Sequence, residues 1–162
     1  MQPFRRKIRI SAAAQRLDLL ESGASGPGER LAASYPVSTS GFGLGSEPGS
    51  NKTPLGRFAI GAKIGADAPL GAVFVSRVPT GEIASLQSPG DPRDLVLTRI
   101  LWLDGLEPGN ANTRERYVYL HGTNHEERIG EPCSHGCVRM RNADIAALFD
   151  LVETGTEVFI NA

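Results

Sequence analysis

The sequence predicts a mainly β fold, a mixed β-sandwich or barrel-like domain with one helix near its C-terminal end. Short segments of alternating or β-branched residues recur along the chain, which is typical of strands. Nineteen glycines and eleven prolines, with only 6% aromatic residues, indicate many turns between short strands. Apolar residues at helical spacing occur in one stretch only, after position 141.

The composition is that of one globular domain covering residues 1–162. Hydrophobic residues make up 40% of the chain and charged residues 22%, and a chain of this length can bury a substantial core. A net charge of −1 gives no field that would attract nucleic acid or an anionic membrane. No window approaches the roughly 18 consecutive apolar residues of a transmembrane helix, so none is expected.

The first half of the chain predicts short strands separated by loops. Segments 7–10 and 16–19 alternate polar and apolar residues, as half-buried strands do. A third strand is expected at 30–37, with Pro36 late in it, where a strand end or edge tolerates proline. The breaker-rich segment 21–28 is expected as a loop.

The least regular stretch is 38–56, whose glycines invite comparison with a phosphate-binding loop. The spacing Gly41-x-Gly43-x-Gly45 does not match the dinucleotide-binding pattern, and no helix pattern follows it. Lys52 also lacks the glycine that precedes the lysine of a nucleotide-binding P-loop. We therefore expect a surface or substrate-facing loop.

The second half predicts further strands and the single helix. Strands are expected at 57–60, 72–78, 95–103, 117–120 and 157–160. The most apolar run, 95–103, is expected to be the central strand and to end at a turn, Asp104-Gly105. A turn at 79–82 and a polar loop at 85–94 are expected before it. The helix is expected to be capped by Asn142, to end at Gly155, and to present Ile145, Leu148, Phe149 and Val152 on one face.

Residues with catalytic potential concentrate in 121–140. This stretch holds all three histidines and both cysteines of the chain. The strand expected at 117–120 would place His121 at the rim of a sheet, where catalytic groups commonly lie. Cys137 follows 16 positions later, within Ser134-His135-Gly136-Cys137. A cysteine and a histidine that meet in space form the minimal nucleophile–base pair.

Residue types alone leave two interpretations of Cys137 open. In the first, it is a nucleophile: Gly136 permits a tight turn, and consecutive backbone N–H groups in such a turn can stabilise an oxyanion. His121 would take the thiol proton, and Arg139 and Arg141 add positive charge nearby. In the second, Cys137 is a small buried apolar residue, as most free cysteines are.

A metal site is a further alternative. Cys133, His135 and Cys137, with His121 or His125, are ligand types that zinc accepts. The spacing disfavours zinc, because the usual pair of ligands is joined to a second pair some distance away. The stretch also departs from the zinc-deaminase signature, since its second cysteine comes one position late. A disulfide between the two cysteines is sterically conceivable and would act as a redox switch.

Residue by residue, this stretch closely resembles the L,D-transpeptidase catalytic domain family (YkuD-type). The family pattern of a histidine, a gap of mid-teens length and then Ser/Thr-His-Gly-Cys is met by His121-Gly122 and Ser134–Cys137. The resemblance extends over nearly the whole chain. Four further segments look like the family framework: Gln15-Arg-Leu17, Tyr35–Thr39, Thr53–Phe58 and Gly155–Ile160.

The resemblance implies a cysteine-dependent acyl transfer on peptidoglycan stem peptides, with no metal or cofactor. Cys137 would attack the carbonyl that joins an L-centre to a D-amino acid in a tetrapeptide stem, which expels the terminal D-alanine. The implied partners of Cys137 are His121 as the general base, oriented through the Gly122 carbonyl, the backbone donors of His135, Gly136 and Cys137 itself, and Ser134 as support of the loop.

One position departs from well-known members of the family. They carry asparagine two residues after the cysteine, whereas Arg139 stands here, as in another branch of the family. A guanidinium suits bidentate binding of a carboxylate, so Arg139 is predicted to bind a carboxylate of the stem. Cys133 is not part of the family pattern and is left as a bystander or a regulatory residue.

The fate of the thioester and the location of the protein stay open at this stage. An amine acceptor from a neighbouring stem gives a cross-link, water gives a shortened stem as in an L,D-carboxypeptidase, and a third possibility is a cell-wall-binding module without chemistry. The N-terminal charges are not followed by the apolar core of a signal peptide, because Ser11, Gln15, Arg16 and Asp18 interrupt it. The family implies the periplasm or cell envelope, and the missing signal leaves the cytoplasm as the alternative.

Overall fold

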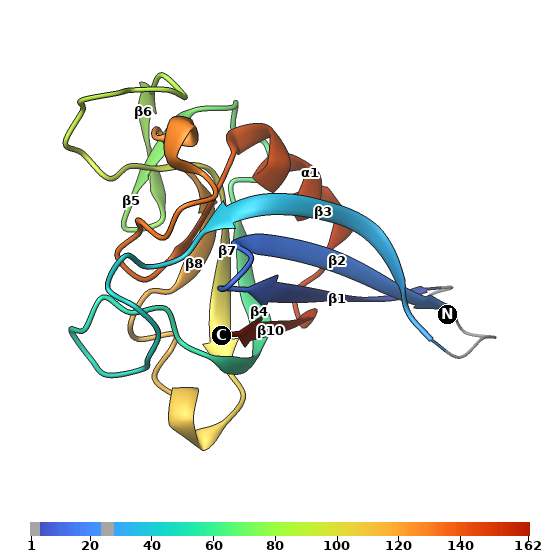
Figure 1. Ribbon diagram of the computed structural model, residues 1–162. Helices are drawn as coiled ribbons and strands as arrows, with labels where there is room; N and C mark the ends of the chain where they lie inside the picture. Colours follow the sequence, from blue (N-terminus) through green and yellow to red (C-terminus); the bar gives the residue numbers. More distant parts are fainter. Residues whose placement is uncertain (1–3, 24–27) are drawn as a thin grey trace.

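The computed structural model describes residues 4–23 and 28–162, which form ten strands, one α-helix and two 3-10 turns (Figure 1). In chain order the elements are β1 (Phe4–Ser11), β2 (Arg16–Gly23), β3 (Arg30–Ser38), β4 (Gly56–Ile64), β5 (Ala72–Val75), β6 (Val78–Ile83), β7 (Val96–Gly105), η1 (Pro108–Asn110), β8 (Tyr119–Gly122), η2 (Glu126–Arg128), β9 (Val138–Met140), α1 (Asn142–Leu151) and β10 (Glu157–Asn161). The mainly β prediction is confirmed.

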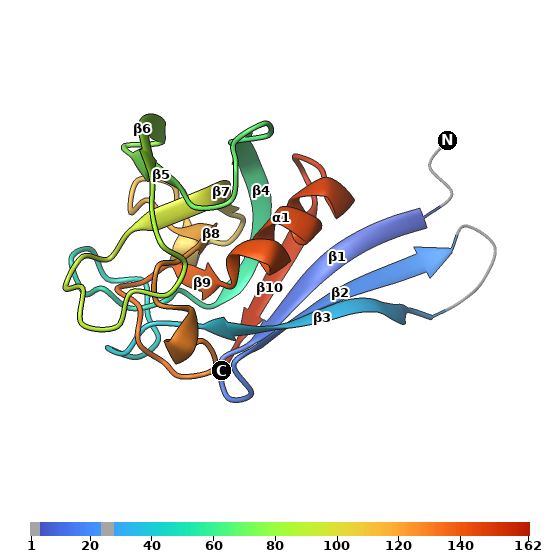
Figure 2. The same ribbon diagram turned by 90° about the horizontal axis from the view of Figure 1, so that it is seen from above.

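Eight of these strands form a closed mixed barrel. Their order is β4-β10-β1-β2-β3-β9-β8-β7, and a further pairing of β4 with β7 closes the ring. Two pairs are parallel, β1–β10 and β8–β9, and the other pairs of the ring are antiparallel. Closure pairs every ring strand on both sides, although β3 meets β9 only at Val37 and Ser38. The hairpin β5–β6 attaches to β7 outside the ring, and β1, β2 and β3 project beyond the rest of the molecule (Figure 2).

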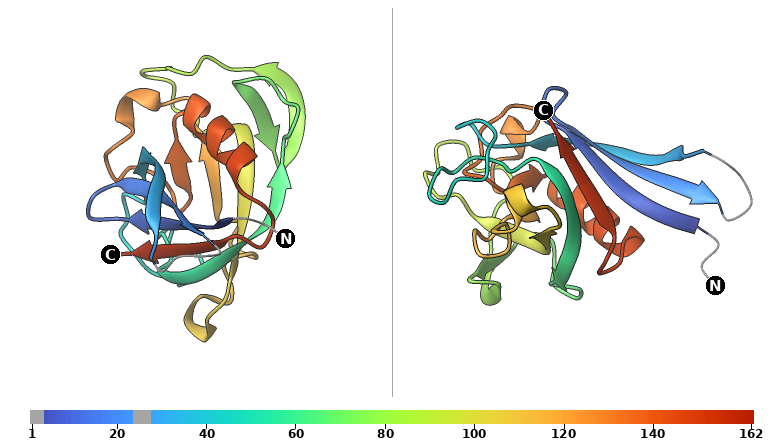
Figure 3. Two further views of the ribbon diagram at one scale, coloured as in Figure 1. Left: turned by 90° about the vertical axis from the view of Figure 1, so that its right-hand side faces the viewer. Right: turned by 90° about the horizontal axis from the view of Figure 1, so that it is seen from below.

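One large apolar core joins the strands to α1. Ile145 and Leu148 of the helix are fully buried together with inward-facing residues of the ring strands, among them Leu120, Val138 and Ile160. Each such side chain contributes about 1.5–3 kcal/mol when it leaves water. The helix lies against β7 and β8 and packs into the core that the ring strands surround (Figures 2 and 3). Within the described ranges, no helix has the length and apolar character needed to cross a bilayer.

The hairpin turn differs from the prediction. The expected turn at 79–82 lies inside β6, and the expected strand 72–78 is broken instead at Ser76 and Arg77. Both residues have left-handed φ values, 48° and 67°, as a two-residue turn between right-twisted strands requires. Neither is glycine or asparagine, so composition gave no signal there.

Other element boundaries also shift. β8 begins two residues later than expected, after Tyr117 with φ of 57°, and β7 continues through the predicted turn Asp104-Gly105. Asn142 is the first helical residue rather than the cap, and its side chain instead bonds to Thr98, Thr123 and Glu126. The helix ends at Leu151 rather than at Gly155, because the chain is already extended at Val152. The predicted loop 21–28 is wrong at its start, because β2 runs to Gly23, and 24–27 lie outside the described residues.

Candidate active site

The parallel pair β8–β9 brings the two ends of the sequence motif together. Leu120 is in register with Val138, and His121 with Arg139. Side chains alternate along a strand, and in-register residues of a parallel pair share a face. Leu120 and Val138 face the core, so His121 and Arg139 lie on the opposite face, as does Cys137, one residue before Val138. Nucleophile and base candidates thus come from neighbouring strands and share one face of the sheet.

Backbone contacts from the first half of the chain fix the loop before β9. The Thr39 carbonyl accepts hydrogen bonds from the N–H groups of Cys133 (2.9 Å) and Ser134 (3.0 Å). The Thr53 hydroxyl donates to the Gly136 carbonyl over 2.9 Å. Thr39 and Thr53 are almost completely buried, so these bonds act in a region of low dielectric.

Inside the loop, Ser134 and Gly136 shape the turn that leads to Cys137. The buried Ser134 hydroxyl donates to the Cys137 carbonyl (2.5 Å) and accepts from the Gly136 N–H (3.2 Å). Gly136 has φ of +124°, a conformation that residues with a side chain rarely adopt. The predicted supporting residues therefore lie in one turn around the nucleophile candidate.

The Cys137 sulfur lies beside the N-terminal end of β8. It accepts a hydrogen bond from the Tyr119 N–H (3.3 Å), and its thiol donates to the Tyr117 carbonyl (3.3 Å). Burial raises the pKa of the Cys137 thiol to about 11, and the Asp94 carboxylate acts in the same direction. The Tyr119 N–H, Arg139 and Arg116 act against this increase. The resting group is therefore a thiol at neutral pH.

His121 is held in a single tautomer. The residue is 2% exposed, and Nδ1 lies 2.5 Å from the Gly122 carbonyl oxygen. A carbonyl can only accept, so Nδ1 carries the proton and Nε2 is left as the basic atom. Burial lowers the pKa of His121, and Arg139 acts in the same direction, while Asp94 and the Gly122 carbonyl oppose them. The ring is therefore neutral at pH 7 and able to accept a proton.

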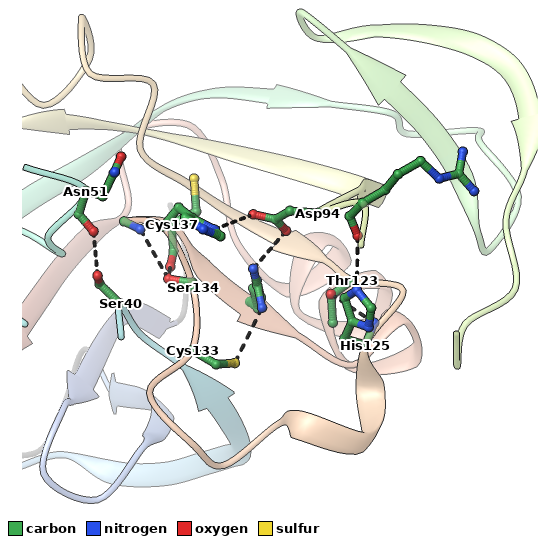
Figure 4. A network of polar contacts seen from close by, with 12 residues as sticks. Ser40, Asn51, Asp94, Thr123, His125, Cys133, Ser134 and Cys137 are labelled. Carbon is green, nitrogen blue, oxygen red and sulfur yellow. Dashed lines mark hydrogen bonds and ion pairs between the residues drawn. The ribbon is translucent and has the colours of Figure 1, made fainter. Parts of the chain in front are cut away.

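A carboxylate outside the motif joins these residues: Asp94, from the loop before β7 (Figure 4). Asp94 Oδ1 pairs with Arg139 Nη2 at 3.0 Å, and Asp94 Oδ2 accepts from His135 Nδ1 at 3.1 Å. Burial raises the pKa of Asp94, but His121, Arg139 and the hydrogen bonds from Arg139 and His135 outweigh it, so the pKa lies below its usual value. The sequence interpretation treated 85–94 as a polar loop and missed Asp94, because no local pattern shows its distant partners.

Arg139 is buried, with only 3% of its surface exposed. Its Nη2 is occupied by Asp94, its Nη1 donates to the Cys133 sulfur over 3.4 Å, and its Nε has no partner among the described residues. His135, by contrast, is exposed on one side and packs its ring against Phe42, with 5.7 Å between the ring centroids.

Arg116 is a second cation near the nucleophile that the sequence interpretation missed. Its Nη2 donates to the Lys52 carbonyl over 2.8 Å, and Nη1 to the Gly45 carbonyl over 3.3 Å. Burial lowers the pKa of Arg116, while Glu47 and Cys137 raise it. Arg116 thus ties the irregular loop 38–56 to the surroundings of Cys137.

The alternative ligand set does not converge. Cys133 bonds to Arg139, and His125 bonds to Glu127 and to the Arg93 carbonyl. Across residues 4–23 and 28–162, no three His, Cys, Asp or Glu side chains are grouped as metal ligands. Both cysteines are free thiols, and their sulfur atoms point in different directions in Figure 4.

The comparison with known families agrees with this architecture. The family model of the L,D-transpeptidase catalytic domain (YkuD) matches residues 5–160. The chain belongs to this family. L,D-transpeptidases act on peptidoglycan, and the matched range includes every residue of the site described above.

Relatives with curated descriptions match parts of this L,D-transpeptidase domain. A putative L,D-transpeptidase, YkuD of Bacillus subtilis, is 33% identical over 91 residues, which are 54% of this chain and 48% of that protein. The probable L,D-transpeptidase YbiS of Escherichia coli K12 is 54% identical over 43 residues, 26% of this chain and 14% of that protein. The chain thus spans about half the length of the first relative and less of the second.

Solved structures support the fold. An L,D-transpeptidase from Xylanimonas cellulosilytica superposes with a TM-score of 0.59 at 20% identity, covering 99% of this chain and 62% of that one. L,D-transpeptidase 3 of Mycobacterium tuberculosis, solved with a faropenem-derived adduct, gives a TM-score of 0.58 at 16% identity, covering 98% and 61%. At these identities the likeness shows the shared fold alone.

Proposed function

We propose that this protein transfers acyl groups between peptidoglycan stem peptides through a thioester on Cys137. The observation that carries the proposal is the placement of Cys137 and His121 on one face of β8–β9, with Nδ1 of His121 bound to the Gly122 carbonyl. A module that only bound the cell wall would have no use for such a pair. Membership of the L,D-transpeptidase family supports the substrate class.

In the proposed reaction, Cys137 attacks the carbonyl between the L-centre and the D-amino acid of a tetrapeptide stem. The thiol proton passes to Nε2 of His121 as the carbon–sulfur bond forms. His121 then protonates the departing amine, and D-alanine leaves. Because the thiol has a raised pKa and the imidazole a lowered one, the proton moves during attack rather than in the resting protein.

The loop 134–137 is proposed to stabilise the oxyanion of the tetrahedral intermediate. Backbone N–H groups of His135, Gly136 and Cys137 are the candidate donors, and each donor in such a site is worth about 3 kcal/mol. In the resting structure the Gly136 N–H is engaged by the Ser134 hydroxyl over 3.2 Å. Ser134 is therefore proposed to hold the turn in shape.

Binding of a stem carboxylate by Arg139 stays a prediction. The guanidinium is already paired with Asp94, so a substrate carboxylate would have to share or displace that partner. An Arg139→Lys variant with full activity would contradict the prediction, because lysine cannot present a planar fork.

The acceptor distinguishes two outcomes of the same thioester. An amine of a neighbouring stem gives a cross-linked dimer, which is transpeptidation, and water gives a free tripeptide stem, which is carboxypeptidation. We expect the protein to act in the periplasm or cell envelope, where its proposed substrate lies.

The test is turnover of a disaccharide-tetrapeptide, with D-alanine release and product masses measured for the wild type and for His121→Gln. Stoichiometric D-alanine with dimer or tripeptide is expected for the wild type, and a loss of at least 10²-fold for the variant. A folded wild-type protein that releases no D-alanine would overturn the proposal.

A further inference from the structure

We propose that Asp94 is a positioning residue of this site, which holds the loop carrying Cys137 through His135 and balances the charge of Arg139 beside Cys137 and His121. The proposal rests on the acyl-transfer function inferred above. Asp94 lies 27 positions before His121 in the sequence, outside the motif from His121 to Cys137.

The loop around Asp94 is fixed by a buried side chain next to the site. Asn124, fully buried just after β8, accepts from the Leu95 N–H with Oδ1 (3.2 Å) and donates to the Arg93 carbonyl with Nδ2 (3.3 Å). One amide therefore holds the residues on both sides of Asp94. The backbone around Asp94 is therefore held by a residue that follows β8, the strand that carries His121.

From this position one oxygen of Asp94 contacts the motif, and the other contacts β9, the strand that follows the motif. Oδ2 accepts from Nδ1 of His135, whose ring also packs against Phe42. His135 is two residues before Cys137, so its restraint limits the turn that presents the sulfur. Oδ1 pairs with Arg139, the residue in register with His121.

The charged groups that act on His121 and Cys137 come from three segments of the chain. Asp94 of the loop before β7 and Arg139 of β9 act on both His121 and Cys137, and Arg116 of the segment before β8 acts on Cys137. Burial has the largest effect on the pKa of His121 and on that of Cys137. Among the charged groups, Asp94 raises both pKa values and Arg139 lowers both. Loss of the Asp94 charge leaves Arg139 unbalanced, and both pKa values should fall.

The direction of the two changes separates positioning by charge from simple loosening of the loop. If the loop only opened, burial would be relieved, and the pKa of His121 would rise towards its ordinary value while that of Cys137 fell. If the Asp94 charge is what matters, the pKa values of both groups fall together. The His121 titration therefore distinguishes the two cases.

The experiment is an NMR titration of the three histidine rings with Asp94→Asn, combined with iodoacetamide alkylation of Cys137 followed by peptide mass mapping. We expect a lower His121 midpoint and, at pH 9, roughly fivefold faster alkylation of Cys137 than in the wild type, from removal of one nearby charge. Asp94→Glu keeps the charge, so its His121 midpoint and its Cys137 alkylation rate should lie close to those of the wild type. Neither measurement requires turnover, so a failed stem-peptide assay would leave this test intact.

Asp91→Asn is the matched control, because it removes a carboxylate from the same loop. Asp91 pairs with Arg93 at 3.0 Å, and neither His121 nor Cys137 is among the groups whose pKa it shifts. It should leave both titrations unchanged. Arg139→Gln, the reverse change, should move both midpoints upward. An unchanged or raised His121 midpoint in Asp94→Asn would overturn the proposal, as would equal effects of Asp91→Asn and Asp94→Asn.

Discussion

The two faces of the β8–β9 pair carry different kinds of residue on the same strands. The inner face presents Leu120, Val138 and Met140 to the apolar core, all without measurable exposure. The outer face presents His121 and Arg139, buried but polar and held by specific partners. Alternation along a strand puts these roles one residue apart.

The difference shows how the domain separates stability from chemistry. The inner face stabilises the fold through the apolar area and volume that it buries. Such packing tolerates substitutions that conserve volume. The outer face depends on proton positions and on charges that oppose one another, as Asp94 and Arg139 do. Substitutions on the inner face should therefore lower the stability of the protein, and substitutions on the outer face should lower its activity.

Removal of the nucleophile should have the largest effect. Cys137→Ala is expected to lower kcat/KM by a factor on the order of 10⁴ or more, as loss of a covalent nucleophile does in other enzymes. Its free energy of unfolding should change by less than about 1 kcal/mol, because the cysteine is only partly buried. Urea unfolding alongside the stem-peptide assay checks both values, and residual activity within tenfold of wild type would contradict the assignment.

The protonation state of the outer face predicts a steep pH dependence. With a pKa of about 11, Cys137 should be alkylated by iodoacetamide roughly 10³-fold faster at pH 10 than at pH 7. His121 must be neutral to accept a proton, and its pKa is lowered from 6.5, so acylation should persist below pH 6.5 and fail only as the pH falls through the lowered pKa. An alkylation rate already at its plateau at pH 7 would indicate a preformed thiolate–imidazolium pair instead.

A cavity on the inner face should affect stability and leave the chemistry in place. Leu120→Ala is expected to cost about 3 kcal/mol of unfolding free energy, as for other fully buried leucines. Leu103→Ala, in the same core but on β7, is the matched control and should cost a similar amount. Well below the melting temperature, kcat/KM should stay within about threefold of wild type for both. A selective loss of activity in Leu120→Ala would show that the faces are coupled.

The smallest effect is expected for the second cysteine. Cys133 accepts a hydrogen bond from Arg139 over 3.4 Å, but sulfur is a weak acceptor, and Asp94 supplies the stronger contact to Arg139. Cys133→Ala should therefore change kcat/KM by no more than about twofold and stability by less than about 1 kcal/mol. A larger loss would assign Cys133 a part in orienting Arg139.

The sequence predicted the strands with strong local patterns and the motif residues, and the structure shows why other features escaped it. β9 has only three residues after a glycine and a cysteine, and its pairing with β8 and β3 is non-local. Asp94 has no motif of its own, and its partners lie 41 and 45 positions away in the chain, at His135 and Arg139. Topology, rather than spacing, brings them together.

The same limit applies to the hairpin turn. Pro79 and Gly81 are typical turn residues, yet they lie in β6, while Ser76 and Arg77 adopt the left-handed turn. Arg77 is held there from a distance, by a hydrogen bond to the Tyr119 hydroxyl (3.0 Å) and by stacking on Trp102. Tertiary contacts thus override the local preference.

The most direct test of acyl transfer by this site is the intact mass of the protein after brief incubation with a disaccharide-tetrapeptide and acid quenching. We predict an adduct equal to the disaccharide-tripeptide acyl group, mapped to the peptide segment of Cys137 and absent from Cys137→Ala. An unmodified wild-type protein, or an adduct on Cys133 instead, would contradict the assignment of Cys137 as the nucleophile.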